Sequence, residues 1–396
     1  MTSAHPDIFL LAGRDRRLSS GHPWVYSNEV RMDAAAKSLE PGSVVTLRRV
    51  DGKPLGTGTF NPHVLIAYRQ FTDDGRAALD TDFIAGRLAR ALALRQRLIG
   101  EPYYRLIHGE ADGLPGLAVD RFNDTTVVQC ATAGMDRLLP LVLAALDRVL
   151  DPVAVVLRND GAFRDLERLT HGVQVAKGSI MPPTPVVENG LRFATDPLAG
   201  QKTGWFFDQR DNRAFVAQLA VGARVLDLYC HAGGFGISAV ARGAQSSLGI
   251  DSSEPALTLA RQAAEWNGLA DRCVFERENV YVALERLAAE GGTFNLVVAD
   301  PPAFVKSRKD LKPGLSGYRK LTRLAAAVVQ PGGFLFIASC SHNVDFPAFQ
   351  EEVAHGLSQA GRTARILRAA GAGVDHPMHP HLAESAYLTT LTLQLD

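Results

Sequence analysis

The chain has 396 residues, of which 46% are hydrophobic and 21% charged, the usual balance of a globular protein. This length predicts two or three domains rather than one core. Lysine plus arginine equals aspartate plus glutamate at 42 each, which argues against a nonspecific nucleic-acid binder but allows a local basic patch. No apolar run approaches the roughly twenty residues of a membrane helix, and the first residues lack a secretory signal. We therefore expect a cytoplasmic protein without a membrane partner.

Residues 1–77 contain short apolar runs separated by turn residues. Ser43–Arg49 and His63–Phe71 have the composition of strands. Between them, residues 51–54 predict a turn and Leu55–Phe60 a strand that carries glycine. The region is predicted to be a small β-barrel or sheet. Near its start the region has basic and aromatic residues that would suit RNA binding: Arg14, Arg16, Arg17, His22 and Trp24. The alternative for Trp24 is a place in the core.

Residues 78–189 mix helix and strand patterns. Apolar residues recur with helical spacing in two segments and form short strand-like runs in three others. The helices are Thr81–Ile99 and Met135–Leu150, and the strands are Gly116–Asp120, Thr125–Cys130 and Val153–Leu157. Residues 181–188 hold three prolines and fit either a linker or the start of an irregular strand.

From residue 190 to residue 396, apolar strands alternate with helices, which indicates an α/β fold with a parallel sheet covered on both faces. The predicted parallel strands are Arg224–Tyr229, Ser247–Asp251, Cys273–Glu276, Phe294–Asp300 and Gly333–Ser339, with helices at Glu254–Asn267 and Tyr281–Glu290. The last strands, near Ala364–Leu367 and Tyr387–Leu395, are expected to close the sheet as an antiparallel pair.

Ligands bind to such sheets at the carboxyl ends of the strands. Asp227 ends the first strand before the Gly233-Gly234 turn, where it could face the ammonium group of an amino-acid ligand. Asp251 ends the next strand, where a carboxylate can bind ribose hydroxyls, and Asn279 follows the third, where it could read an adenine edge. Taken one at a time, Asp227 and Asp251 could instead simply cap the ends of their strands. The candidate cofactor contacts are Asp227, Gly233, Gly234, Asp251, Ser252, Asn279 and Asp300.

A nicotinamide dinucleotide is the competing ligand for this edge of the sheet. Its binding turn has the pattern G-x-G-x-x-G, whereas His231 occupies a position where such folds need glycine. A pyrophosphate would therefore fit poorly.

The fourth strand ends in Asp300-Pro301-Pro302. The prolines fix φ and lack N–H groups, so the carbonyls of this turn stay available to the amino edge of a planar base. A proline-stiffened loop without function is the alternative. Lys306 and Arg308 follow the turn and could contact RNA phosphates, although the solvated start of a helix would also explain them.

Cys340 follows the fifth strand, in the sequence ASCSH. A thiolate that adds to carbon 6 of cytosine makes carbon 5 nucleophilic enough to take a methyl group. This chemistry predicts Cys340 as a nucleophile and Asp300 as the group that steadies the ring at its N3/N4 edge. A packed strand residue is the alternative for Cys340.

No metal site is predicted. The other three cysteines are far apart and form no C-x-x-C pair, so neither a disulfide nor zinc is indicated. His376, His379 and His381 cluster, but no acidic or cysteine partner has ligand spacing. Substrate contact or a solvated loop is therefore favoured for these histidines.

Several stretches carry a family resemblance. VLDLYCHAGGFGISAVA, DPPAFVKSRKDLKPGLSGYRKL and ASCSHNV resemble the bacterial large-subunit ribosomal RNA cytosine-C5 methyltransferases of the type I group, and QKTGWFFDQRDNR is typical of the same group. GHPWVYSNEV and PGSVVTLRRVDGKPLGTGTFNP resemble its PUA RNA-binding domain, and HGEADGLPGLAVDRF its central α/β domain. The resemblance implies a PUA-like domain over residues 1–77, a central domain over 78–189 and a Rossmann-like methyltransferase domain over 190–396.

The same resemblance implies S-adenosylmethionine as methyl donor, a flipped-out cytosine of large-subunit ribosomal RNA as substrate, and often a homodimer. It places the nucleophile at Cys340 and the carboxylate beside the base at Asp300. The chain departs from the pattern at two positions. Asn279 stands where an aspartate is common, and Pro302 stands where many RNA C5 methyltransferases carry a second cysteine that helps to release the product.

Two other functions stay open on the sequence. Methylation of an exocyclic nitrogen uses the same D-P-P turn and needs no cysteine. A non-catalytic RNA-binding assembly factor would keep the fold without binding S-adenosylmethionine. The intact set of Asp227, Asp251, Asp300 and Cys340 argues against the second possibility.

Overall fold

The computed structural model describes residues 5–201 and 203–396, which fold into two compact units. Unit 1 consists of Met1–Pro182, Pro197–Gly204 and Asp375–Ser385, and unit 2 of Pro183–Asp196, Trp205–Val374 and Ala386–Asp396. The short segment 375–385 thus belongs to unit 1, although its neighbours on both sides in the sequence belong to unit 2. Within the described residues, no helix has the length and apolar character needed to cross a membrane.

Unit 1 begins with a five-stranded sheet in the order β1-β3-β4-β5-β2. Its strands are β1 (Asp7–Phe9), β2 (Trp24–Val25), β3 (Ser43–Arg48), β4 (Pro54–Phe60) and β5 (Tyr68–Thr72), with the short helices α1 (Arg16–Ser19) and α2 (Ala34–Lys37). The predicted strand from His63 begins only at Tyr68. The Asn61 side chain accepts from the His63 N–H (3.1 Å) and the Asn61 N–H donates to the Ala67 carbonyl (2.8 Å), which closes a loop instead.

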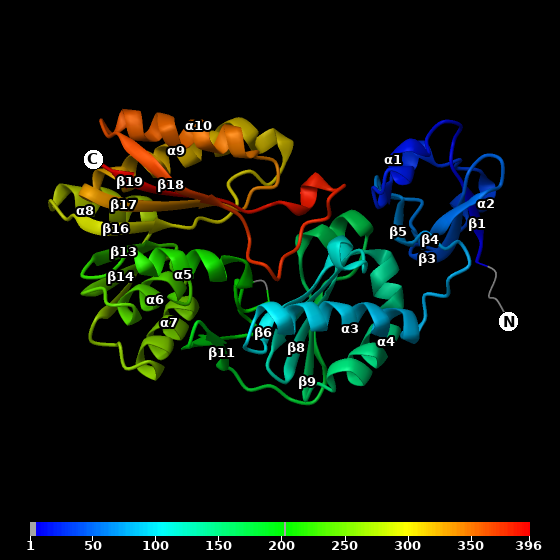
Figure 1. Cartoon of the computed structure of the whole chain (residues 1–396), viewed down its shortest axis with the longest axis horizontal. Coiled ribbons are helices and arrows are strands. Elements are labelled where there is room, and N and C mark those ends of the chain that lie inside the picture. The colour runs from blue at the N-terminus through cyan, green and yellow to red at the C-terminus, as the bar shows by residue number, and fades with distance from the viewer. Residues whose placement is uncertain (1–4, 202) are drawn as a thin grey trace. The chain divides into compact units, whose positions relative to one another are not determined.

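A second five-stranded sheet in unit 1 has the order β10-β9-β8-β7-β6. Its strands are β6 (Tyr103–His108), β7 (Leu117–Phe122), β8 (Thr125–Cys130), β9 (Ala154–Asn159) and β10 (Gly172–Lys177). Helices α3 (Thr81–Leu98) and α4 (Ala133–Leu150) lie together against this sheet and share its apolar core (Figure 1). Asp80 and Thr132 cap the two helices with their side-chain oxygens.

Unit 2 contains a hairpin of β11 (Thr184–Glu188) and β12 (Leu191–Thr195). The proline-bearing segment 181–188 therefore leads into a strand and is not a plain linker. Asn189 and Gly190 connect the two strands with φ angles of 52° and 77°, the conformation that an Asn-Gly hairpin turn favours.

The main sheet of unit 2 has seven strands in the order β15-β14-β13-β16-β17-β19-β18. They are β13 (Arg224–Leu228), β14 (Ser246–Asp251), β15 (Cys273–Arg277), β16 (Phe294–Ala299), β17 (Val329–Ser339), β18 (Ala364–Ala370) and β19 (Thr389–Leu395). β13 to β17 are parallel, and β18 and β19 add the predicted antiparallel pair.

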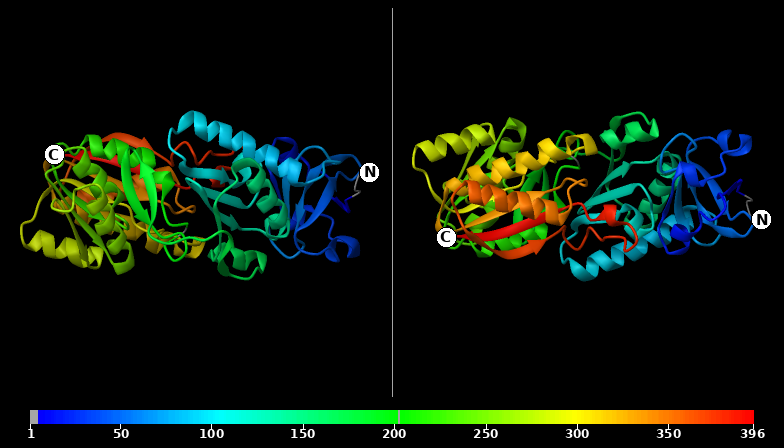
Figure 2. Two further views of the ribbon diagram at one scale, coloured as in Figure 1. Left: turned by 90° about the horizontal axis from the view of Figure 1, so that it is seen from below. Right: turned by 90° about the horizontal axis from the view of Figure 1, so that it is seen from above.

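Helices cover both faces of this sheet. They are α5 (Arg210–Gln218), α6 (Gly234–Ala241), α7 (Glu254–Trp266), α8 (Val280–Ala289), α9 (Leu311–Ala327) and α10 (Phe346–Gln359). α5 to α7 lie on one face and α8 to α10 on the other (Figure 1), and Figure 2 shows α9 and α10 side by side. β14 and β15 are added on one side of β13, whereas β16 and β17 are added on its other side. This reversal of strand order creates a switch point at the carboxyl ends of β13 and β16, which is the usual ligand position in such folds.

Candidate active site

Asp227, the fourth residue of β13, is buried beneath the switch point with 1% exposure. Its Oδ2 accepts from the Gly236 N–H at 2.8 Å, whereas its Oδ1 is buried and has no hydrogen-bond partner among the described residues. Burial, followed by the nearby charges of Asp300 and Asp251, raises the pKa of Asp227 to about 7. A buried carboxylate oxygen without a partner fits a cationic ligand group.

The backbone after β13 adopts an unusual conformation. Tyr229, His231 and Gly233 have φ angles of 59°, 49° and 75°, in the left-handed region. Non-glycine residues rarely adopt this conformation, and clusters of them mark functional sites more often than ordinary turns. The turn leads the chain directly from Asp227 into helix α6.

The glycines of this turn are required by close packing. A Cβ atom at Gly234 would lie 3.0 Å from Cδ of Arg213, and one at Gly236 would lie 2.3 Å from Oγ of Ser247. Gly233 has a positive φ, and a Cβ atom there would lie 3.1 Å from the Phe275 ring. At these positions a residue with a Cβ atom would crowd its neighbours, so glycine leaves the backbone of the turn open to a ligand.

Asp251 ends β14 and orders the same turn. One oxygen accepts from the His231 N–H (3.0 Å) and the other from the Ser253 N–H (2.9 Å). Each carboxylate oxygen has a second lone pair, so Asp251 can still accept from ribose hydroxyls. Ser252 is exposed beside it.

Asn279 lies after β15 and caps helix α8. Its side-chain oxygen accepts from the N–H groups of Tyr281 (2.9 Å) and Val282 (3.4 Å). The capping leaves the amide nitrogen as the group suited to an adenine acceptor.

The D-P-P turn follows β16, next to β13. Asp300 is partly exposed and close enough to Asp227 for their charges to interact. Pro301 is buried and Pro302 exposed. Lys306 and Arg308 are exposed at the start of the short helix before α9, where Asp310 accepts from the Ser307 N–H.

Cys340 lies directly after β17, and its Sγ is 3.9 Å from the Pro301 carbonyl oxygen. It is partly exposed, whereas the other three cysteines are buried. Burial raises the pKa of Cys130 and of Cys273 to about 12, and raises that of Cys230 well above the usual value of a thiol. Cys340 is therefore the cysteine of this chain that is placed to react.

A buried hydroxyl cluster, which no sequence pattern predicted, supports the Cys340 loop. The Tyr318 hydroxyl of α9 lies 2.8 Å from the hydroxyls of both Ser339 and Ser341. The Ser341 hydroxyl also accepts from the Val305 N–H (3.2 Å). The cluster thus joins the loop after β16 to the loop after β17.

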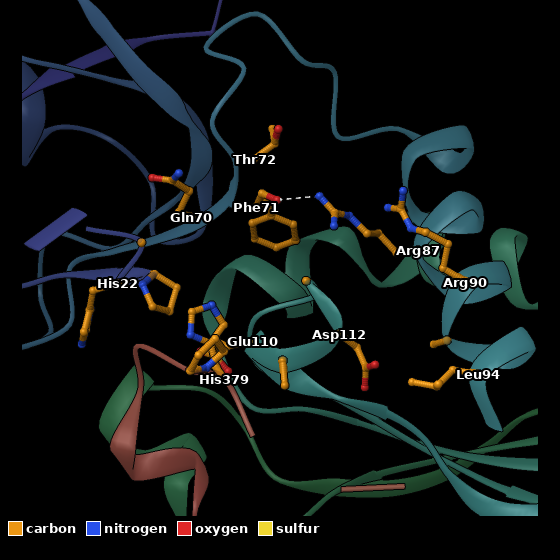
Figure 3. A pocket seen from close by; sticks show the side chains of 16 residues that line it. His22, Gln70, Phe71, Thr72, Arg87, Arg90, Leu94, Glu110, Asp112 and His379 are labelled. Carbon is orange, nitrogen blue, oxygen red and sulfur yellow. Dashed lines mark hydrogen bonds between the residues drawn. The ribbon is translucent and has the colours of Figure 1, made fainter. Parts of the chain in front are cut away.

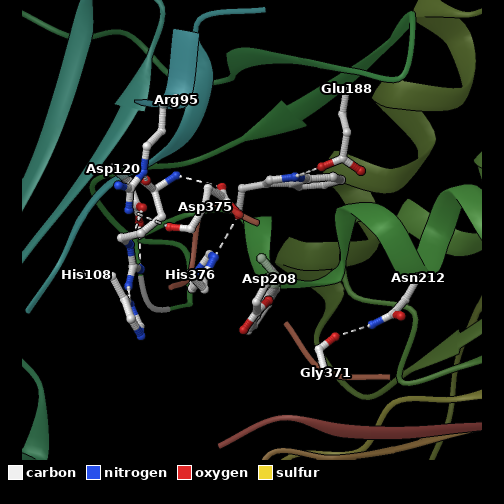
Figure 4. Close-up of polar contacts among 12 residues, drawn as sticks. Arg95, His108, Asp120, Glu188, Asp208, Asn212, Gly371, Asp375 and His376 are labelled. Carbon is white, nitrogen blue, oxygen red and sulfur yellow. Dashed lines mark hydrogen bonds and ion pairs between the residues drawn. The ribbon is translucent and has the colours of Figure 1, made fainter. Parts of the chain in front are cut away.

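A buried ion pair supports the glycine turn. Two nitrogens of the Arg213 guanidinium, Nε (2.6 Å) and Nη2 (2.8 Å), donate to the Glu188 carboxylate, which Figure 4 labels, and the Trp205 indole donates to the same carboxylate (3.0 Å). The Arg213 guanidinium also lies over the Trp205 ring, 4.6 Å from its centroid. Arg213 and Trp205 lie in the motif that the resemblance highlighted, but no role was predicted for either.

The histidine cluster of residues 376–381 belongs to unit 1 and does not form a metal site. His376 is buried and contacts the Asp375 carboxylate (2.9 Å), whereas His381 is exposed. Within residues 5–201 and 203–396, no group of three His, Cys, Asp or Glu side chains could hold a metal ion. Trp24 is half-buried and donates to Glu110 (2.7 Å).

Comparison with known proteins decides the family. Residues 168–388 match the S-adenosylmethionine-dependent methyltransferases, and residues 8–73 match the PUA-like domain. The protein named ribosomal RNA large subunit methyltransferase I of Klebsiella pneumoniae (strain 342) is 34% identical over 396 residues, which cover 98% of this chain and 97% of that protein. The chain belongs to this family of S-adenosylmethionine-dependent methyltransferases.

Two solved structures share the fold of the family over nearly the whole chain. One is described as a SAM-dependent methyltransferase from Streptococcus mutans, with 18% identity, a TM-score of 0.82 and coverage of 98% of this chain and 100% of that one. The other, a methyltransferase in complex with SAH, has 17% identity, a TM-score of 0.83 and coverage of 99% and 100%. The predicted fold class and S-adenosylmethionine as the methyl donor are therefore confirmed.

Proposed function

We propose that this protein methylates carbon 5 of a cytosine in large-subunit ribosomal RNA, with Cys340 as the nucleophile. The curated relatives are named as large-subunit ribosomal RNA methyltransferases, and the chain matches them over nearly their whole length. The observation that carries the chemistry is the position of Cys340, partly exposed and 3.9 Å from the carbonyl of the D-P-P turn. Reaction at carbon 5 needs such a thiol, because that carbon is not nucleophilic in an unmodified cytosine.

The residues at the switch point fit S-adenosylmethionine. The unpartnered Oδ1 of Asp227 suits its ammonium group, and the second lone pairs of Asp251 suit its ribose hydroxyls. The amide nitrogen of Asn279 suits the adenine, and the backbone at Gly233 and Gly234 leaves room for the amino-acid end. We assign Ser252 and Asp300 to the same site from their positions. When bound, S-adenosylmethionine supplies an electrophilic methyl group on its sulfonium.

Cys340 activates the base in this proposal. Its thiolate forms a bond to carbon 6, and the electron pair of the carbon 5–carbon 6 double bond moves toward carbon 5. After carbon 5 has gained the methyl group, its proton leaves, the double bond re-forms, and the carbon–sulfur bond breaks to return the thiolate.

The D-P-P turn holds the base during these steps. The Asp300 carboxylate and the carbonyls of Pro301 and Pro302 accept from the exocyclic amino group, which orients the ring toward Cys340. Lys306 and Arg308 are exposed on the same loop and are assigned to the flanking phosphates.

The test is to supply unmethylated large-subunit RNA with tritiated-methyl S-adenosylmethionine and to identify the labelled nucleoside. Wild type should place the label in 5-methylcytidine, and the Cys340→Ala variant should not. Cys273→Ala, which removes a buried cysteine from β15, is the matched control and should keep the activity. Label on another nucleoside, or activity that survives Cys340→Ala, would favour methylation of an exocyclic nitrogen at the D-P-P turn. Failure to bind S-adenosylmethionine would favour a non-catalytic assembly factor.

The remaining sequence-based expectations stay predictions. We propose that residues 1–77, 78–189 and 190–396 are three domains, the first of them an RNA-binding domain. The homodimer is proposed on the resemblance alone, and the cytoplasmic location on the lack of a membrane-length apolar run and of a secretory signal in the sequence.

A further inference from the structure

Unit 1 contains a pocket of about 510 Å³ that the proposed chemistry does not use (Figure 3). Its walls come from the sheet of β1 to β5, from helix α3, from the loop after β6 and from His379 and Pro380. Pockets of this volume hold ligands of the size of a nucleotide.

Two arginines of α3 line the pocket, and within the described residues neither forms an ion pair with a carboxylate at salt-bridge distance. Arg87 and Arg90 lie three residues apart on one helix face, and burial, together with the charge of Arg90, lowers the pKa of Arg87. Arg87 donates to the Phe71 carbonyl (3.1 Å), but its Nε is buried and has no hydrogen-bond partner in the described residues. Gly113 makes room for this guanidinium, because a Cβ atom there would lie 2.8 Å from Nη1. A pair of like charges held together in this way favours an anionic ligand.

The carboxylates of the pocket are already neutralised by other groups. Glu110 accepts from the Trp24 indole (2.7 Å) and from Arg69 (2.8 Å). Asp112 receives two hydrogen bonds from the buried Arg95, at 2.7 and 2.8 Å. Among the residues that line the pocket, neither carboxylate pairs with Arg87 or Arg90, and outside the lining the charge of Asp73 acts on Arg87.

Neutral donors and one acceptor complete the lining. His379 Nδ1 accepts from the His381 N–H (3.2 Å), so the neutral ring carries its proton on Nε2. Burial and the neighbouring His381 lower the pKa of His379, which keeps the ring neutral at pH 7. Figure 3 shows His22 beside it. The Gln70 side-chain oxygen is a buried acceptor without a partner in the described part of the chain.

We propose that this pocket binds one ribose-phosphate unit of the RNA substrate. Phosphate oxygens only accept hydrogen bonds and carry charge, which matches the donors of Arg87, Arg90 and His379. A ribose 2′-hydroxyl is a donor that matches the Gln70 oxygen and distinguishes RNA from DNA. The inference rests on the proposed function in one respect, namely that the substrate is RNA, and it is independent of the Cys340 chemistry.

The test measures the affinity for a short fluorescein-labelled single-stranded RNA by fluorescence anisotropy at several salt concentrations. Arg90→Glu changes an exposed side chain and should weaken RNA binding about tenfold or more. The slope of the logarithm of the affinity against the logarithm of the salt concentration should become shallower by about one. Arg137→Glu makes the same charge change on α4, outside the pocket, and is the matched control. Equal affinities of the two variants would overturn the proposal.

A second arm tests the sugar contact. Wild type should bind the RNA more tightly than the DNA of the same sequence, and Gln70→Leu should remove most of this preference. No RNA preference in wild type would contradict the assignment of Gln70. Cys340→Ala should bind RNA as wild type does, so a loss of methylation with intact RNA binding separates the chemistry from the pocket. If wild type binds no RNA, both the proposed substrate and the pocket assignment fail.

Discussion

The proposed contact of Asp227 with the ammonium group of S-adenosylmethionine predicts that the affinity for this ligand depends on pH. Its pKa of about 7 results from burial and from the neighbouring Asp300 and Asp251, and only the ionised form can pair with the ligand's ammonium group. Because the pKa is raised, the ionised fraction falls as the pH falls below 7. We expect the affinity, measured by calorimetry, to be constant above about pH 8 and to fall by up to about tenfold per pH unit below 7.

The control for this prediction is Asp227→Asn, which removes the titrating group but keeps its shape. The variant should bind more weakly at high pH, and its affinity should lose most of the pH dependence. The interval from about pH 5.5 to about pH 8.5 brackets the pKa of Asp227. A wild-type affinity for S-adenosylmethionine that is constant over this interval would contradict the role of Asp227.

Gly236 tests how tightly the first turn of α6 is packed. In Gly236→Ala the new Cβ atom would lie 2.3 Å from Oγ of Ser247 and 3.3 Å from Oδ2 of Asp227, so the Ser247 side chain or the backbone around it must move. We expect a loss of about 1–3 kcal/mol in the free energy of unfolding and a weaker affinity for S-adenosylmethionine. Gly86→Ala on α3, where a Cβ atom meets nothing within 4 Å, should be neutral or slightly stabilising. Similar denaturation midpoints for the two variants would contradict this account.

The sequence predicted the positions of some candidate residues better than those of others. Asp227, Asp251, Asp300 and Cys340 could be located because each lies at or next to the end of an apolar strand, and the carboxyl ends of parallel strands meet at one edge. Arg213 could not, because its partner Glu188 lies in a hairpin 25 residues earlier, and no local pattern connects them. Pairing across such a distance depends on tertiary structure alone.

At the scale of elements, Tyr318 connects helix α9 to the two loops of the proposed active site. Tyr318→Phe removes the hydroxyl that joins Ser339 and Ser341, and so leaves buried polar groups unpaired. We expect a loss of about 1–3 kcal/mol in stability. We also expect kcat to fall by up to about a hundredfold, because Cys340 and the D-P-P turn lose their alignment.

The control for Tyr318 is Tyr104→Phe, which removes another buried hydroxyl, one that accepts from Arg121 in unit 1. It should lower stability without changing kcat. The affinity for S-adenosylmethionine should stay the same in both variants, because its proposed contacts lie mainly at β13 to β15. An unchanged kcat in Tyr318→Phe would show that the cluster serves stability only.

Buried strands were easier to predict than those whose bounds are set by loops or whose residues are exposed. The seven-stranded sheet followed from its apolar runs, down to the antiparallel closing pair. The strand expected from His63 starts at Tyr68 because Asn61 forms a local turn, and β10 was missed because its residues are mostly exposed and carry little core signal.

At the scale of the whole molecule, the segment 375–385 is attached to unit 1 by a buried arginine. Arg95 has 0% exposure and donates to the Asp375 carbonyl (2.9 Å) (Figure 4). It also pairs with Asp112 (2.7 Å). Arg95→Met removes these bonds and leaves a buried carboxylate without its cation, at a cost of about 3–5 kcal/mol. We expect faster amide hydrogen exchange in residues 375–385 with an unchanged affinity for S-adenosylmethionine.

The matched control is Arg97→Met on the same helix, where the side chain is exposed. Its exchange should equal that of wild type. Protection of residues 375–385 that persists in Arg95→Met would contradict the proposed attachment. The sequence did not predict this attachment, since the segment reads as a loop between two strands of unit 2, and its partners lie about 280 residues earlier.

The most direct test of the central proposal is to trap the bond between Cys340 and the base. Large-subunit RNA that contains 5-fluorocytidine is incubated with the protein and S-adenosylmethionine and examined on a denaturing gel. Fluorine replaces the proton that must leave carbon 5, so the thiolate cannot be eliminated and the adduct persists. The account predicts a protein–RNA complex with wild type and with Cys273→Ala, and none with Cys340→Ala. Absence of the complex with wild type, or its presence with Cys340→Ala, would contradict the account.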